Sequence, residues 1–98
     1  MKMSIESFTV SYAFETYRGG EKTSHFLSAG VKVDPSVSFD EFQSVQLQAA
    51  YRISVSVIHD ALMRGSLTTE EANDRIRDLK NNYELMKSKF EKSINTEV

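Results

Sequence analysis

The chain has 98 residues, no cysteine and a formal net charge of −2 at pH 7. The absence of cysteine excludes disulfides, thiolate metal sites and cysteine nucleophiles, and favours a cytoplasmic location. The near-neutral charge disfavours binding to duplex nucleic acid, which requires basic surfaces, and no apolar run is long enough to span a membrane. We expect one domain over residues 1–98, made of a β-hairpin (1–34) and a helical hairpin (38–94).

Two alternating segments predict an antiparallel β-hairpin. Apolar side chains occupy every second position over residues 8–14, and His25, Leu27, Ala29, Val31 and Val33 share one phase, which is typical of half-buried strands. We expect these strands to cover about residues 5–17 and 22–33. The Gly-Gly pair between them suits a two-residue type I′ turn. This turn predicts a register in which the numbers of paired residues sum to 39, so that Phe8 faces Val31 and Phe14 faces His25.

A capping box predicts the start of a first helix over residues 39–64. The Ser38 hydroxyl can accept a hydrogen bond from the amide of Glu41, whose side chain can reach back, and Gly65 is a typical helix stop. At 100° per residue the helix carries two apolar stripes on nearly opposite sides, so it needs apolar partners on two sides. The first stripe consists of Phe42, Val45, Ala49, Ile53 and Val57, and the second of Leu47, Tyr51, Val55, Ile58 and Leu62.

A third strand remains an alternative within this segment. Residues 53–57 read Ile-Ser-Val-Ser-Val, which alternates and contains the β-branched residues that strands favour. The caps and the surrounding helical spacing favour the helix.

A second capping box, formed by Thr68 and Glu71, predicts a second helix over residues 69–93. We also expect Glu71 to pair with Arg75 one turn later. The fold class is therefore α+β, a hairpin followed by two long antiparallel helices. Apolar residues of the second helix recur at steps of three and four, which is typical of a narrow packing seam: Ala72, Ile76, Leu79, Tyr83, Met86, Phe90 and Ile94.

The run from Met63 to Glu71 resembles the helical hairpin of short bacterial C-terminal domains, in which a glycine precedes a Leu/Ile-Thr-x-Glu-Glu turn. The resemblance covers about residues 58–80 and implies only a tight antiparallel connection between two helices. It transfers no functional residue to this chain.

The sequence contains no pattern that indicates catalysis or cofactor binding. The two histidines, His25 and His59, have no partner at a spacing typical of metal ligands. Gly65-Ser66 lacks the second glycine of a nucleophile elbow, and no glycine-rich phosphate loop is present. We therefore expect no metal, no cofactor and no enzymatic activity, although a composite active site completed by another chain stays open.

The two-sided apolar helix leads us to expect self-association, with a dimer favoured, and a role as a regulator, scaffold or inhibitor of a larger partner protein. The candidate self-association residues are Phe42, Leu47, Tyr51, Val55, Ile58, Leu62, Tyr83, Met86 and Phe90.

The alternative function is binding of single-stranded nucleic acid through the tip of the hairpin. Aromatic side chains can stack on bases while neighbouring cations meet phosphates. The candidate contact residues are Tyr17, Arg18, Lys22 and Phe26.

Overall fold

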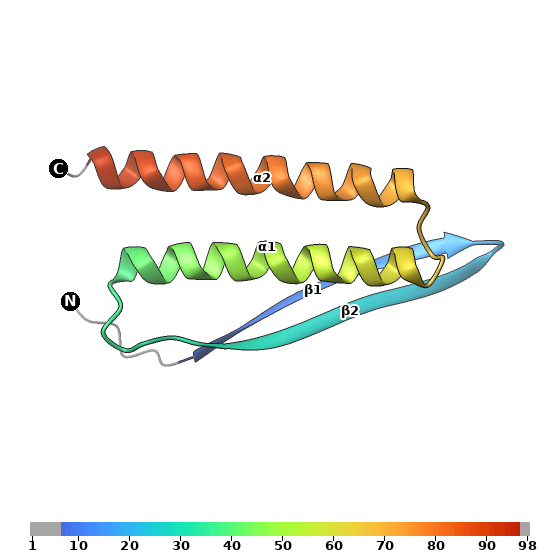
Figure 1. Cartoon of the computed structure of the whole chain (residues 1–98), viewed down its shortest axis with the longest axis horizontal. Coiled ribbons are helices and arrows are strands. Elements are labelled where there is room, and N and C mark those ends of the chain that lie inside the picture. Colours follow the sequence, from blue (N-terminus) through green and yellow to red (C-terminus); the bar gives the residue numbers. More distant parts are fainter. Residues whose placement is uncertain (1–6, 97–98) are drawn as a thin grey trace.

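The computed structural model describes the backbone of residues 7–96 and the side chains of residues 7–89. It has the predicted α+β fold, in the order β1 (Ser7–Arg18), β2 (Glu21–Lys32), α1 (Phe39–Met63) and α2 (Thr69–Thr96). The elements form three layers, with α1 between the hairpin and α2 (Figure 1). The molecule measures 53 × 27 × 17 Å, so it is a thin, elongated slab.

The hairpin has the predicted register, with Phe8 opposite Val31 and Phe14 opposite His25. Gly19 and Gly20 have φ angles of +57° and +82°, in the left-handed region that glycine adopts at little cost. Even-numbered residues of β1 and odd-numbered residues of β2 share the side of the sheet that packs against α1, which we call the inner face. The other residues lie on the outer face.

The first helix begins where the capping box predicts. The Ser38 hydroxyl accepts a hydrogen bond from the backbone N–H of Glu41 at 3.2 Å. Residues 53–57 are helical, so the alternative of a third strand is wrong. The hydroxyl of Ser54 donates to the carbonyl of Ala50 at 2.7 Å, so this buried serine is satisfied within its own helix.

The connection between the helices is tight because Gly65 reverses the chain with a φ angle of +78°. The N–H of Ser66 donates to the carbonyl of Ala61 at 2.9 Å, and the N–H of Gly65 to that of Leu62 at 3.0 Å. These two bonds form a Schellman motif, which satisfies carbonyls at the end of α1. As a result, α1 ends at Met63, one residue earlier than expected.

We expect Gly65→Ala to lower the free energy of unfolding by about 1 kcal/mol, because a Cβ disfavours the left-handed conformation. No atom lies within 4 Å of the position of that Cβ, so the effect comes from the backbone alone. Urea denaturation followed by circular dichroism measures it. Ser66→Ala, one residue further along, is the control, and an equal loss in both variants would contradict this explanation.

The core is concentrated near the connection between the helices. Its fully enclosed part consists of Ile58, Ala61, Leu67 and Ala72, with Tyr12, Phe14, Leu62, Ile76 and Leu79 packed around it. At the opposite end of α1, the rings of Phe8 and Phe42 meet edge to face with centroids 5.3 Å apart. Between these two points Val10, Ile53 and Val57 are buried, and open grooves run beside them along α1.

Candidate interaction surface

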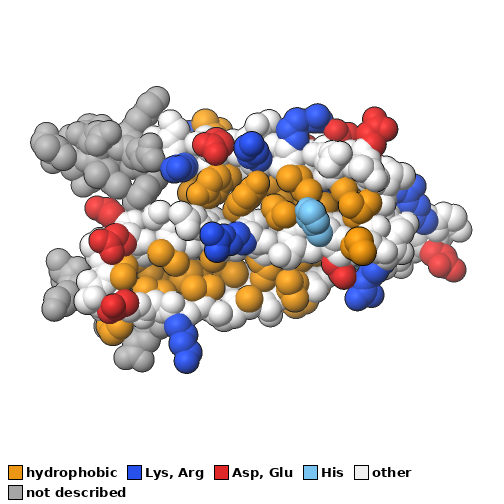
Figure 2. Space-filling view, viewed as in Figure 1, with side chains coloured by type: hydrophobic (Ala, Val, Ile, Leu, Met, Phe, Trp, Pro, Cys, Tyr) orange, Lys and Arg blue, Asp and Glu red, His pale blue; other side chains and the backbone are white. Residues whose placement is uncertain are grey.

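The hairpin and α2 each cover one side of α1, and its remaining surface is open. Figure 2 shows a face of the slab on which hydrophobic side chains gather in two bands, one along the junction of α1 with the hairpin and one along its junction with α2. The two predicted apolar stripes of α1 therefore meet their expected neighbours, which bury Phe42, Ile53, Val57 and Ile58 but leave the other stripe residues partly or largely exposed.

The first open region lies between α1 and β2. It is a hollow of about 420 Å³ whose lining includes Leu27, Ala29 and Val31 from β2 and Val45, Ala49 and Ile53 from α1. A second hollow of about 260 Å³ continues toward the tip of the hairpin and shares Leu27 and Ser56 with the first. We call these two hollows together the α1–β2 groove.

The α1–β2 groove exists because α1 lies mainly over β1. On β1, Val10 and Thr16 are buried and Tyr12 is half-buried, whereas on β2 only His25 is buried. Leu27 on the inner face of β2 is 44% exposed. Apolar side chains on the inner face of β2 thus border open space.

A further hollow of about 470 Å³ lies between the helices, lined by Gln43, Gln46, Leu47, Ala50 and Met86. Its floor continues to Tyr51 and Tyr83, whose rings stack with centroids 4.9 Å apart. One turn beyond Tyr83, the seam of α2 is already open to solvent, since Met86 is 56% exposed.

The residues expected to drive self-association differ in how far the chain itself buries them. Phe42 and Ile58 are buried within the chain itself, so neither is available to a second copy. Val55 and Leu62 are half-buried, as is Leu47. The side chain of Phe90 lies outside the described residues. Sequence reasoning missed the α1–β2 groove, above all Leu27 of β2 and Val45 of α1, because it expected the hairpin to cover the first apolar stripe of the helix.

The candidate nucleic-acid residues at the hairpin tip do not form one surface. The register puts Tyr17, Lys22 and Phe26 on the outer face but Arg18 on the inner face. The Lys22 ammonium pairs with the Glu15 carboxylate at 3.1 Å, and the Tyr17 hydroxyl donates to Glu15 at 3.0 Å. These contacts lower the pKa of Glu15, chiefly through Lys22, and raise the pKa of Tyr17.

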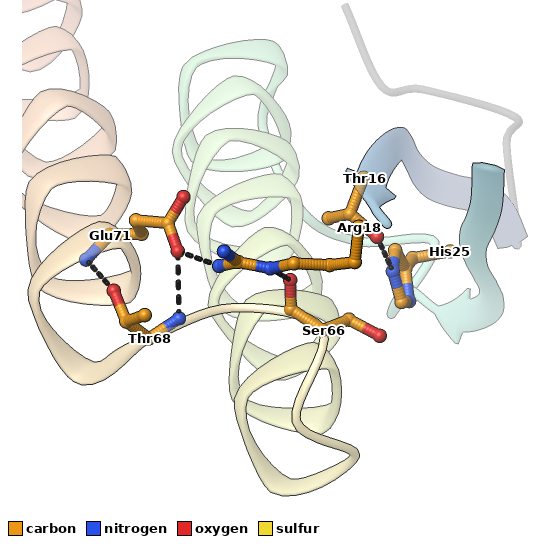
Figure 3. A network of polar contacts seen from close by, with 6 residues as sticks. All are labelled: Thr16, Arg18, His25, Ser66, Thr68 and Glu71. Atoms are coloured by element: carbon orange, nitrogen blue, oxygen red, sulfur yellow. Dashed lines mark hydrogen bonds and ion pairs between the residues drawn. The ribbon is translucent and has the colours of Figure 1, made fainter. Parts of the chain in front are cut away.

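Arg18 instead ties the hairpin to the connection between the helices. Its Nε donates to the carbonyl of Ser66 at 3.2 Å, and its guanidinium also pairs with the carboxylate of Glu71 (Figure 3). The same carboxylate accepts from the N–H of Thr68 at 2.9 Å, while the Thr68 hydroxyl accepts from the N–H of Glu71 at 3.1 Å. The predicted capping box is thereby confirmed and extended to the hairpin.

The expected pair between Glu71 and Arg75 is replaced by other contacts. The Arg75 guanidinium lies 4.4 Å from the centroid of the Phe14 ring, and that ring stacks on His25 with centroids 4.9 Å apart. Nε2 of His25 is 2.9 Å from the hydroxyl of the buried Thr16. These contacts satisfy the inner-face histidine within the fold and give it a structural role.

We expect Glu71→Gln to lower the melting temperature at neutral pH, with a loss that shrinks as the pH falls. The backbone N–H of Thr68, then its hydroxyl and then Arg18, hold the pKa of Glu71 below its ordinary value of 4.5. A carboxylate with a lowered pKa in the folded state stabilises the fold above its ordinary pKa, and this contribution disappears as the pH falls through the folded value.

Thermal unfolding of Glu71→Gln across an acid pH series tests this expectation. Glu70→Gln is the matched control, because Glu70 lies in the same first turn of α2 and makes no ion pair among the described residues. A loss of stability that is the same at neutral and strongly acidic pH would contradict the attribution of this stability to the ionised Glu71 carboxylate.

The overall dimensions show how incompletely the chain encloses itself. Its accessible surface is 7163 Å², whereas a folded monomer of 11.1 kDa exposes about 5,700 Å². Its radius of gyration is 16.4 Å, against about 13 Å for a compact domain of this length. The excess surface, about 1,500 Å², exceeds the roughly 800 Å² that each partner buries in a standard protein–protein interface.

The described residues contain no group of three potential metal-ligating His, Asp or Glu side chains. Within the same part of the chain, neither helix is apolar enough over a sufficient length to cross a membrane. Comparison with known proteins gives no match to any family model, curated protein or solved structure. The fold and the grooves therefore define the chain as a small α+β protein with an unfilled apolar surface.

Proposed function

We propose that this protein is a non-enzymatic protein–protein interaction module that works as a homodimer and regulates, scaffolds or inhibits a larger partner protein in the cytoplasm. The observation that carries the proposal is the α1–β2 groove, an apolar surface that the chain's own residues leave open. The surface in excess of that expected for a monomer supports it, because a second copy would remove that excess from water.

Two further observations support a binding role over catalysis. Among the described residues, every buried side-chain polar atom has a hydrogen-bond partner, so none is held in reserve for a substrate. Thr16 and His25, the buried polar pair on the inner face, bond to each other. Perturbed ionisable groups inside a cleft are typical of active sites, whereas here the shifted groups Glu15, Tyr17, Asp34 and Glu71 are all exposed.

The alternative function, single-stranded nucleic-acid binding, gains no support from the hairpin tip. Lys22 is paired with Glu15, and Arg18 is bound to Ser66 and Glu71 on the opposite face. A strand of nucleic acid on the outer face would therefore meet aromatic rings without an unpaired cation beside them.

Sedimentation equilibrium over a range of micromolar concentrations tests the proposed dimer. We expect a molar mass that approaches twice 11.1 kDa as the concentration rises. A mass of 11.1 kDa throughout the range would contradict the proposal. High salt should not weaken the dimer strongly, because its main contribution is the burial of apolar surface.

A further inference from the structure

We propose that the second copy docks on the free edge of β2, so that the dimer contains a four-stranded antiparallel sheet in the order β1-β2-β2-β1. The two α1 helices would lie side by side on the inner face of this sheet and close both α1–β2 grooves. This inference rests on the homodimer proposed above and specifies which surface forms it.

The edge of β2 is better suited to this pairing than the edge of β1. A hairpin has two unpaired edges, and each can accept a further strand. The α1–β2 groove borders β2, where Leu27, Ser28, Ala29 and Val31 line it, whereas β1 contributes only Val10 to its lining. A strand added at the edge of β2 would therefore both form backbone hydrogen bonds and bury apolar surface. A strand added at the edge of β1 would gain mainly the backbone hydrogen bonds.

The spacing of strands and helices agrees with this arrangement. In Figure 1, α1 runs along the hairpin, and it contacts both strands. Because α1 lies mainly over β1, a two-fold axis between the two β2 strands would place the α1 helices two to three strand spacings apart, which is about 10–14 Å. Packed helices lie about 8–10 Å apart, so a separation at the short end of this range lets the strand pairing and the helix contact form together.

The position of the axis follows from the groove. Leu27 and Ser56 line both of its hollows, so they lie at the same level along it. An axis next to Leu27, at Ser28, pairs Phe26 of each copy with Gly30 of the other. Phe26 is 66% exposed and lies on the outer face with Gly30, so its ring would cover the residue that has no side chain.

The same axis brings opposite charges together on α1. Arg52 and Asp60 lie four residues before and four residues after Ser56, and all three line the groove. When two antiparallel α1 helices meet at Ser56, Arg52 of each copy lies opposite Asp60 of the other. Among the described residues Arg52 makes no ion pair, and Asp60 pairs only with Arg64, an exposed neighbour.

Single cysteines test the edge directly, because the chain has none of its own. Ser28 and Ser11 are cross-strand partners, so S28C and S11C form a matched pair that differs only in the strand carrying it. In the proposed sheet the two Ser28 residues lie one strand spacing apart, which is about 5 Å. The two Ser11 residues lie three strand spacings apart, which is about 15 Å. A disulfide requires Cα atoms within about 7 Å.

Under mild oxidation we expect S28C to form a covalent dimer and S11C to remain uncrosslinked. Crosslinking of S11C instead, or of neither variant while sedimentation shows a dimer, would overturn the β2 edge but leave the proposed homodimer intact. A monomeric wild-type chain would remove both proposals.

Charge reversal provides a second test that acts between copies. We expect R52E alone, or D60R alone, to weaken the dimer about tenfold or more, because each places like charges opposite one another twice. An equimolar mixture of the two variants should dimerise again. In a mixed dimer the two substituted side chains face each other with opposite charges, and the unchanged Asp60 of one copy faces the unchanged Arg52 of the other.

Rescue within one chain is excluded, because Arg52 and Asp60 are about 12 Å apart along one helix. A mixture that dimerises no more tightly than its separate components would overturn the proposal.

Discussion

Ile58→Ala should lower the free energy of unfolding by about 4 kcal/mol, the largest loss of stability that we expect from one substitution in this chain. Ile58 is fully buried, at 0% exposure, and it sits at the centre of the cluster formed with Ala61, Leu67 and Ala72. Truncation removes three carbon atoms and leaves a cavity between all three layers. The free energy of unfolding of a domain is about 5–15 kcal/mol, so this one substitution removes a large fraction of it.

Urea denaturation at a fixed protein concentration measures the effect of Ile58→Ala, since the proposed dimerisation would make the apparent stability depend on concentration. Leu85→Ala is the control: Leu85 is 54% exposed on α2, and its truncation should change stability by less than about 0.5 kcal/mol. Equal losses in the two variants would show that the enclosed cluster does not hold the layers together.

Leu27→Asp should weaken the proposed dimer by about a hundredfold or more without unfolding the monomer. Leu27 lines both hollows of the α1–β2 groove, and a second copy would bury its exposed part. The substitution removes apolar area and introduces a carboxylate that the interface would have to desolvate, and the two-fold symmetry makes this happen twice. Sedimentation equilibrium measures the dissociation constant.

Leu85→Asp is the matched control for Leu27→Asp. Both replace a partly exposed leucine by aspartate, but Leu85 lies on α2, away from the groove. Circular dichroism should show the same helical content in both variants. Equal dimer affinity in the two would contradict the assignment of the groove as the interface.

Much of the fold could be predicted because it depends on local signals. Gly19-Gly20 specifies a two-residue turn, and the alternation of apolar residues agrees with the register that this turn imposes. The hydroxyls of Ser38 and Thr68 mark the starts of the helices because each accepts an amide hydrogen bond three residues on. These signals need no knowledge of tertiary packing.

The candidate interaction surface could be predicted only in part, because it depends on how far each neighbour covers α1. A helical projection shows which residues share a side, but not that α1 lies mainly over β1 and leaves Leu27 open. Ile58 looked available for self-association for the same reason, yet α2 and the hairpin enclose it. The predicted register already implied that Arg18 and Lys22 lie on opposite faces of the hairpin, because side chains alternate along each strand.

Hydrogen exchange of the backbone amides tests the central claim most directly, because it reports on the β2 edge in solution. The two residues that flank a two-residue turn, Arg18 and Glu21, bond to each other through both backbone groups, and such pairs recur at every second position. The amides of Phe26 and Ser28 lie between these pairs and therefore point away from β1. For the same reason the amides of Ser11 and Ala13 point away from β2. At high protein concentration we expect slow exchange at Phe26 and Ser28, and fast exchange at Ser11 and Ala13. Fast exchange at all four, unchanged by concentration, would show that nothing covers the edge of β2.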